Sequence, residues 1–155
     1  MSESSHLDER GRARMVDVSG KPETERSATA EAFVVLSPEA KAALFGGKLP
    51  KGDALAATRL AAIGGAKRTS DLIPLCHPIP IFAIEADIEE VDAGARIIVT
   101  VKTVGRTGVE MEAVTGAVLG AVTVYDMVKS IDRSAEIGPV RLLAKSGGRS
   151  GEWVR

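Results

Sequence analysis

Apolar and polar residues alternate with the two-residue period of a β-strand in the middle of the chain. Within residues 81–91, apolar side chains from Phe82 to Ile88 alternate with polar or acidic ones, and a second, largely β-branched stretch covers 96–104. Asp92-Ala93-Gly94 lies between them and favours a tight turn. The pattern predicts a β-hairpin whose strands each have one apolar face.

Two further strands are predicted near the ends of the folded region. Over 27–36, small and β-branched residues lead into Phe33 and a short apolar run, which Ser37 and Pro38 end. A last strand is predicted over 138–145, ahead of a glycine-rich segment. Four strands are therefore available for one sheet.

Three other stretches have the spacing of helices. A short helix is expected over 38–45, with Ser37 as its N-cap. A longer one is predicted over 53–63, with Gly64-Gly65 as its stop. The longest covers 109–130, about 22 residues or roughly 33 Å if all of it is helical.

The two long helices and the four strands follow the order strand, helix, strand, strand, helix, strand. This is the split β-α-β order of the ferredoxin-like fold. We predict an α+β domain with a four-stranded antiparallel sheet and both long helices on one face. The other face would still hold β-branched residues such as Val99 and Val101, which favours a covering subunit.

Length and composition limit the alternatives. With 155 residues, 45% of them hydrophobic and 26% charged, the chain fits one globular domain. We expect a disordered polar tail over 1–14 and a single domain over 15–155 with a flexible end, 146–155. A net charge of −1 gives no field to hold nucleic acid or a membrane, and one cysteine without a secretory signal indicates a cytoplasmic protein.

Three prolines between residues 74 and 80 make a stiff, extended arm. The arm would fix the direction of the His77 imidazole, either for function or packed against a backbone carbonyl. A Cys76–His77 nucleophile pair is disfavoured, because neighbours in an extended chain point to opposite sides. Together with His6 these residues are too few for the usual zinc site.

The longest helix carries acidic residues near both ends. Thr107 to Glu110 matches a capping box, whereas Glu112 has only the helix dipole in its favour. Asp126 is spaced to pair with Lys129, as in an ordinary surface ion pair. Glu112 and Asp126 are 14 residues apart, about 21 Å along a helix, so one small substrate reaches both only if two subunits share a site.

Several cations stand near the predicted turns, although the standard nucleotide-binding loops are absent. They are either solvated or converge on a polyphosphate, which needs cations and backbone donors in one cleft. These residues are Arg26, Lys51, Lys67, Arg68, Lys129, Lys145 and Arg149.

Four motifs resemble a known family. They are Leu75-Cys76-His77-Pro78-Ile79-Pro80, Gly108-Val109-Glu110-Met111-Glu112-Ala113, Tyr125-Asp126-Met127 and Lys145-Ser146-Gly147-Gly148. In this order the chain resembles the cyclic pyranopterin monophosphate synthases, the molybdenum cofactor biosynthesis protein C family, from Met15 to about Gly151. The resemblance implies a ferredoxin-like fold and a hexamer, a trimer of dimers with active sites at the dimer interface. The implied reaction is a lyase step that rearranges a cyclised dihydroguanosine triphosphate to cyclic pyranopterin monophosphate and releases diphosphate.

The resemblance also implies residue roles. Asp126 is similar to the catalytic acid or base of the family, with Lys129 beside it as a second proton carrier. The other implied site residues are Leu75, Cys76, His77, Glu110, Met111 and Glu112, with Lys51, Arg26, Lys67 and Lys145 to neutralise the triphosphate. No resident metal or redox cofactor is expected, and Mg²⁺ with the substrate phosphates is left open.

Two positions depart from the family pattern. Val128 stands where a cysteine is expected, and Arg149 stands where a lysine is common. Neither change removes a proton-transfer group. The planar guanidinium of Arg149 nevertheless binds phosphate with a different geometry from a lysine.

Two other functions compete with this interpretation. A regulatory module of the same fold would bind a small metabolite without converting it. RNA binding through the sheet is disfavoured by an aromatic content of only 3% and by the lack of an aromatic recognition motif.

Overall fold

The computed structural model describes residues 6–155, so the first five residues of the predicted tail lie outside the described residues. Its strands all pair antiparallel in one sheet, in the order β2-β3-β1-β4-β5. The strands are β1 (Thr24–Val35), β2 (Ala83–Val91), β3 (Gly94–Gly105), β4 (Glu136–Ser146) and β5 (Trp153–Val154). The helices are α1 (Pro38–Phe45), α2 (Ala54–Lys67), α3 (Thr69–Leu72) and α4 (Glu110–Val128).

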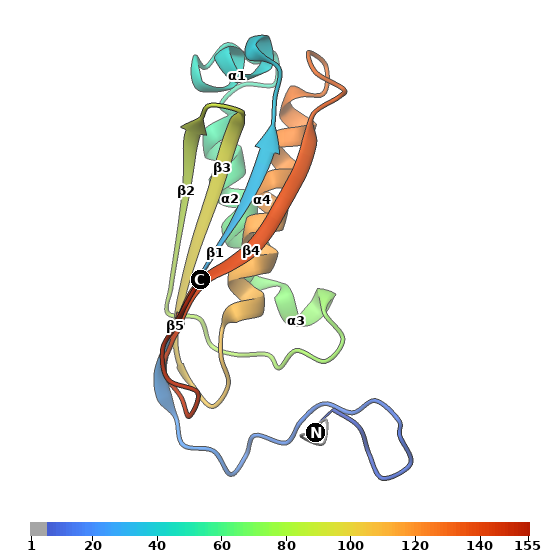
Figure 1. Ribbon diagram of the computed structural model, residues 1–155, viewed down its shortest axis with the longest axis vertical. Coiled ribbons are helices and arrows are strands. Elements are labelled where there is room, and N and C mark those ends of the chain that lie inside the picture. Colours follow the sequence, from blue (N-terminus) through green and yellow to red (C-terminus); the bar gives the residue numbers. More distant parts are fainter. Residues whose placement is uncertain (1–5) are drawn as a thin grey trace.

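The long helices α2 and α4 lie side by side on one face of the sheet (Figure 1). The predicted α+β class and ferredoxin-like order are therefore confirmed. The sheet has a short fifth strand that the sequence did not predict, because Trp153 and Val154 pair with the end of β4.

The core between the two layers is built from small and β-branched residues. On β1 every second side chain from Ala28 to Val34 is at most 1% exposed and faces the helices. The hairpin register, Ala83 opposite Lys102, places the apolar positions of β2 and β3 on the same side. Small residues let the helices approach the strands closely, because little side-chain volume separates the backbones.

The helix α2 does not stop at Gly64-Gly65 as predicted but continues to Lys67. Gly65 is buried against α4, where a Cβ atom would come within 2.8 Å of the Leu119 Cβ. Gly116 of α4 packs in return on the backbone of Ala62. These glycines are therefore contact points between two helices, and not a helix terminus.

The expectation for Val99 and Val101 was wrong. Both are fully buried, and Val99 lies against Gly116 of α4. Alternation along β3 sends these odd-numbered residues toward the helices and Thr100 to the other side, where its hydroxyl bonds Thr29 at 2.9 Å. The argument for a covering subunit that rested on these valines does not hold.

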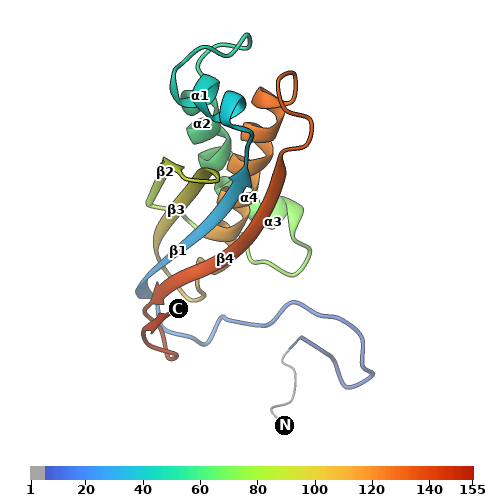
Figure 2. The ribbon, with the colours of Figure 1, turned by 45° about the horizontal axis from the view of Figure 1, so that its top comes forward.

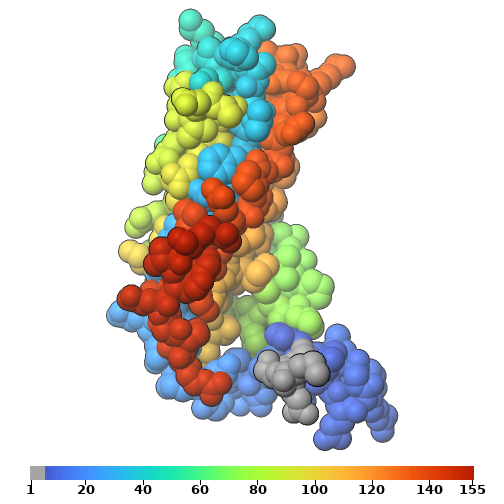
Figure 3. Space-filling view, in the orientation of Figure 1, coloured from blue at the N-terminus to red at the C-terminus, as the bar shows by residue number. Residues whose placement is uncertain are grey.

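The face of the sheet without helices carries a charged cluster. Glu31 accepts hydrogen bonds from Arg96 Nε at 2.6 Å and from Arg141 Nε at 2.5 Å. Both guanidinium groups lie over the Phe33 ring, 5.9 Å (Arg96) and 5.7 Å (Arg141) from its centroid. Burial would raise the pKa of Glu31, but the hydrogen bonds from both arginines keep it below its ordinary value. Figure 3 shows the upper half of this face open, whereas the C-terminal segment (dark red) lies over its lower half.

Two segments meet beneath the first turn of α4. The proline-rich arm leaves α3 and passes this end of the helix on its way to β2, and the N-terminal segment runs along the same end of the molecule (Figures 1 and 2). His77 joins them, since its Nε2 lies 2.6 Å from the carbonyl oxygen of Val16. The fold thus places the arm motif beside the start of α4.

Candidate active site

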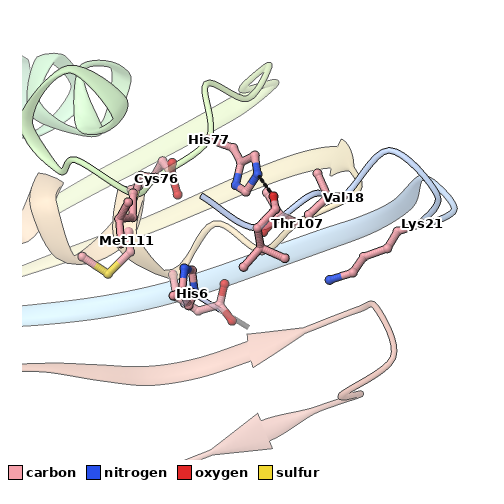
Figure 4. Close-up of a pocket in the computed structure, with 12 residues that line it drawn as sticks. His6, Val18, Lys21, Cys76, His77, Thr107 and Met111 are labelled. Carbon is pink, nitrogen blue, oxygen red and sulfur yellow. Dashed lines mark hydrogen bonds between the residues drawn. The ribbon is translucent and has the colours of Figure 1, made fainter. Parts of the chain in front are cut away.

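A cavity of about 320 Å³ lies where the arm, the N-terminal segment and the start of α4 meet (Figure 4). Most of the substrate contacts implied by the sequence motifs line it. They are Leu75, Cys76 and His77 from the arm and Glu110, Met111 and Glu112 from α4. Residues far apart in the chain are thereby brought into one site.

His77 has a defined tautomer. A carbonyl oxygen only accepts hydrogen bonds, so the ring nitrogen Nε2 donates its proton to Val16. In the neutral imidazole this leaves Nδ1 as an acceptor, and no described residue occupies it. The arm therefore orients the ring through a backbone carbonyl while keeping one nitrogen for a ligand.

Glu112 is the buried acid of this cavity. Its side chain is 4% exposed, and burial raises its pKa to about 7, an effect that its own backbone N–H opposes and Glu110 increases. Burial, together with the Glu112 carboxylate, also raises the pKa of the Cys76 thiol. Cys76 therefore lines the cavity as a thiol, whereas Glu112 can hold or release a proton near neutral pH.

A second cavity of about 650 Å³ adjoins the first, and Glu110 lines both. Cations surround it: Lys21, Arg26, Arg106 and Arg149. Such a group of guanidinium and ammonium donors in a hollow suits a phosphate chain.

The predicted capping box of α4 does not form. Val109 is the N-cap residue and no side chain caps the helix. Glu110 instead accepts a hydrogen bond from Lys145 Nζ at 3.0 Å, and Lys145 also contacts Ser150 Oγ at 3.1 Å. The hydrogen bond from Lys145 of β4 to Glu110 of α4 thus replaces the predicted side-chain cap. It also places Lys145 beside the cationic cavity.

The last turn of α4 carries a different group. Asp126 accepts hydrogen bonds from Lys51 Nζ at 2.7 Å and forms an ion pair with Lys129 Nζ at 2.8 Å. The bonds from Lys129 and Lys51 lower the pKa of Asp126 to about 2, and Asp126 raises the pKa of Lys129. A hollow beside this cluster is lined by Lys51, Lys129 and Tyr125.

The predicted site residues therefore fall into two groups at opposite ends of α4. One contains the cavity residues with Arg26 and Lys145, and the other contains Lys51, Asp126 and Lys129. Lys67 is exposed at the end of α2 and lines neither of the two adjoining cavities nor the hollow near Asp126.

Some residues of the cavities were not singled out as site residues from the sequence. Lys21 and Thr107 line both adjoining cavities, and Arg106 lines the cationic one. Lys21 lies near the N-terminal end of the family resemblance, which begins at Met15. This position was the only feature of the sequence that could have pointed to Lys21 as a site residue. No feature of the sequence pointed to Arg106 as a site residue, because a lone arginine in a turn is ordinarily solvated.

The fold and the site define a class of protein. It is a two-layer α+β protein with a cavity lined by cationic side chains at one end of its core helix and a Lys–Asp–Lys cluster at the other. The model of the MoaC family matches residues 15–148. The chain belongs to the MoaC family.

Curated relatives match the chain over nearly its whole length. A cyclic pyranopterin monophosphate synthase of Corynebacterium glutamicum is 52% identical, covering 99% of this chain and 98% of the relative. Proteins of the same name from Streptomyces avermitilis and Thermomicrobium roseum are 53% and 52% identical. The alignments cover 97% and 100% of this chain, and 89% and 95% of those relatives.

Proposed function

We propose that the protein is a cyclic pyranopterin monophosphate synthase, a lyase of molybdenum cofactor biosynthesis. It converts a cyclised dihydroguanosine triphosphate to cyclic pyranopterin monophosphate and releases diphosphate. The observation that carries the proposal is the joining of the arm motif and the first turn of α4 around one cavity, next to a cationic hollow. The names of relatives about half identical to the chain support the same reaction.

The two adjoining cavities suit the two halves of such a substrate. The ring system would lie among His77, Met111 and Glu112, where acceptors and a protonatable acid face the cavity. The triphosphate would lie against Arg26 and Lys145, with Lys21, Arg106 and Arg149 as additional donors. This arrangement pairs the charged part of the substrate with cations and the planar part with the wall formed by the arm and the first turn of α4.

The chemistry requires proton transfer and stabilisation of anions. Forming a cyclic monophosphate from a triphosphate with loss of diphosphate requires a substrate oxygen to attack the α-phosphorus while the bond to the leaving diphosphate breaks. Asp126 is ionised at neutral pH and can accept a proton, but its low pKa makes it a weak base. Lys129 and Lys51 therefore hold the protons of this cluster and neutralise developing charge, and Asp126 keeps both lysines in place.

A complete active site needs two copies of the chain. Glu112 and Asp126 lie on one continuous helix and are separated by about 21 Å, which is more than one small substrate can bridge at its reacting centre. The cluster of Lys51, Asp126 and Lys129 in one copy would therefore complete the cavity of another copy. This agrees with the trimer of dimers that the family resemblance implies.

Among residues 6–155, no three His, Cys, Asp or Glu side chains gather in a way that could hold a metal ion. Mg²⁺ bound to the substrate phosphates remains compatible with the cationic cavity.

Incubation of the purified protein with the cyclised triphosphate tests the proposal. We expect diphosphate and cyclic pyranopterin monophosphate in equal amounts, and the variant Asp126→Asn should bind the substrate but release neither product. A regulatory module would instead bind the compound without turnover, and its Asp126→Asn variant would change affinity alone. Absence of product under conditions in which a family member is active would overturn the proposal.

A further inference from the structure

The helix-facing side of β3 is a row of apolar residues that continues into a threonine. Alternate residues Ala95, Ile97, Val99 and Val101 are fully buried. Thr103 follows in the same series and is also buried, with 2% of its surface exposed, but it carries a hydroxyl group. Valine has nearly the same shape and would match the apolar row, so packing alone does not account for the hydroxyl group.

The hydroxyl group of Thr103 donates a hydrogen bond to the carbonyl oxygen of Pro80, near the end of the proline-rich arm. Proline has no N–H, so this carbonyl is the only backbone group through which Pro80 can be held. Two residues later the amide of Phe82 donates to Lys102 at 3.0 Å, and the pairing of β2 with β3 begins at Ala83. Thr103 therefore attaches the arm to the sheet before the strand pairing begins.

The contact at Pro80 controls the direction of His77. Pro78 and Pro80 have fixed φ angles, and the residue in front of each is restricted to extended conformations. This stiff segment transmits the position of the Pro80 carbonyl to the imidazole ring. The ring is also held by the carbonyl of Val16, which belongs to a segment outside the helices and strands. Thr103 belongs to a paired strand, so it is the more rigid of the two attachment points.

We propose that Thr103 is a positioning residue of the active site. Its hydroxyl group holds the Pro80 carbonyl and thereby fixes the part of the arm that carries Cys76 and His77. Thr103 lines neither of the two adjoining cavities, so it acts through the arm and not by contact with a substrate. The inference rests on the proposed function for what the arm binds, whereas the contact between Thr103 and the arm is independent of it.

Cys76 reports the position of the arm without an enzymatic assay. It is the only cysteine of the chain, it precedes His77, and burial raises the pKa of its thiol. Dithionitrobenzoate reacts with the thiolate, so a buried thiol reacts slowly. Thr103→Val removes the hydroxyl group and releases the arm, and we expect Cys76 to react roughly tenfold faster than in the parent protein.

Three further variants separate the hydroxyl group from packing. Thr103→Ser keeps a hydroxyl group and should keep the slow reaction of Cys76, whereas Thr103→Ala lacks one and should behave like Thr103→Val. The matched control is Thr100→Val on the same strand, because the Thr100 hydroxyl bonds Thr29 on the opposite face of the sheet. In this control Cys76 should react at the parent rate.

The kinetic constants measure the consequence for the site. A displaced His77 weakens substrate binding in the cavity, while the Lys51–Asp126–Lys129 cluster at the other end of α4 is unchanged. We therefore expect the KM for the cyclised triphosphate to rise roughly tenfold in Thr103→Val and kcat to change by less than about threefold. A variant that was only less stable would contain fewer active molecules, which lowers the apparent kcat and leaves KM unchanged.

The outcomes separate this inference from the proposed function. Parent-like labelling of Thr103→Val, or equally fast labelling of Thr103→Ser, would overturn the inference. Faster labelling with an unchanged KM would also overturn it, because the arm would then move without affecting the site. If labelling of Cys76 follows the hydroxyl group but no protein makes product, the parent included, the contact with the arm is supported and the proposed function is overturned.

Discussion

Glu110 and Glu112 stand two residues apart in the first turn of α4, but their surroundings differ. Glu110 meets the ammonium group of Lys145, whereas Glu112 turns into a buried cavity in which no described cation contacts it. The helix dipole favours an ionised acid at this position, yet burial has the larger effect and raises the pKa of Glu112 to about 7. Neighbouring residues of the same type thus acquire different chemistry from their packing.

The raised pKa of Glu112 predicts a pH dependence of stability. Its ordinary pKa is 4.5, so between about pH 4.5 and 7 the unfolded chain binds fewer protons than the folded one, and the free energy of unfolding falls as the pH rises. Glu112→Gln removes this fall and should stabilise the substrate-free protein at pH 8 by an amount on the order of 2 kcal/mol. Thermal unfolding of both proteins from pH 4.5 to pH 8 measures the difference.

The comparison contains its own control. Near pH 4.5 the neutral acid and the amide are similar, so the two melting temperatures should converge there. A difference in melting temperature that stays constant across this pH range would contradict a buried, protonated Glu112. So would a Glu112→Gln variant whose stability relative to the parent protein is lower at pH 8 than at pH 5.

At the scale of an element, α2 and α4 meet through glycines that look like helix stops in the sequence. Gly64 and Gly65 are adjacent, but a Cβ atom at Gly64 would meet nothing within 4 Å, whereas one at Gly65 would lie 2.8 Å from the Leu119 Cβ. The same dipeptide therefore contains one glycine that is dispensable for packing and one that the helix pair requires. The sequence cannot separate them, because the distinction depends on α4.

This difference predicts opposite effects of one substitution at adjacent positions. Gly64→Ala should raise the free energy of unfolding by roughly 0.5–1 kcal/mol, because alanine restricts the unfolded chain and favours the helix. Gly65→Ala should lower it by roughly 1–3 kcal/mol, because the added methyl group pushes α2 away from α4. Urea unfolding of the three proteins gives both values, and equal effects at the two positions would show that the contact between the helices is not tight.

At the scale of the whole molecule, one helix carries two groups of predicted site residues at its opposite ends. The length of α4 keeps Glu112 and Asp126 apart, and the helix packs against α2 and the sheet along its length. By length and composition α4 would also be able to cross a membrane, but 56% of its apolar stretch is buried inside the protein. Most of its apolar residues therefore pack in the core.

A shared site predicts complementation between inactive variants. Asp126→Ala and Glu112→Ala should each be inactive, and a mixture that has exchanged subunits should regain part of the activity, since some interfaces then contain both intact half-sites. Random exchange in equal amounts would place a heterodimer in about half of the dimers, each with one intact site. The assay measures diphosphate release before and after exchange, which a tagged subunit monitors independently.

Failure of this rescue despite demonstrated exchange would contradict the shared site. It would leave the reaction itself untouched, because a site built within one chain would still perform it. Mixing each variant with itself under the same conditions provides the control.

The sequence determined the order of the elements, the hairpin, the long helix and the motif residues, because periodicity, turn residues and spacing are local properties of the chain. It also predicted that two subunits share the site if Glu112 and Asp126 act on one substrate, since the distance along a helix follows from residue numbers alone. Only the tertiary structure decided which face of β3 is buried, that Glu110 meets Lys145 instead of capping α4, and that Gly65 is a packing contact. Each of these depends on a segment far away in the chain, whose position no local pattern records.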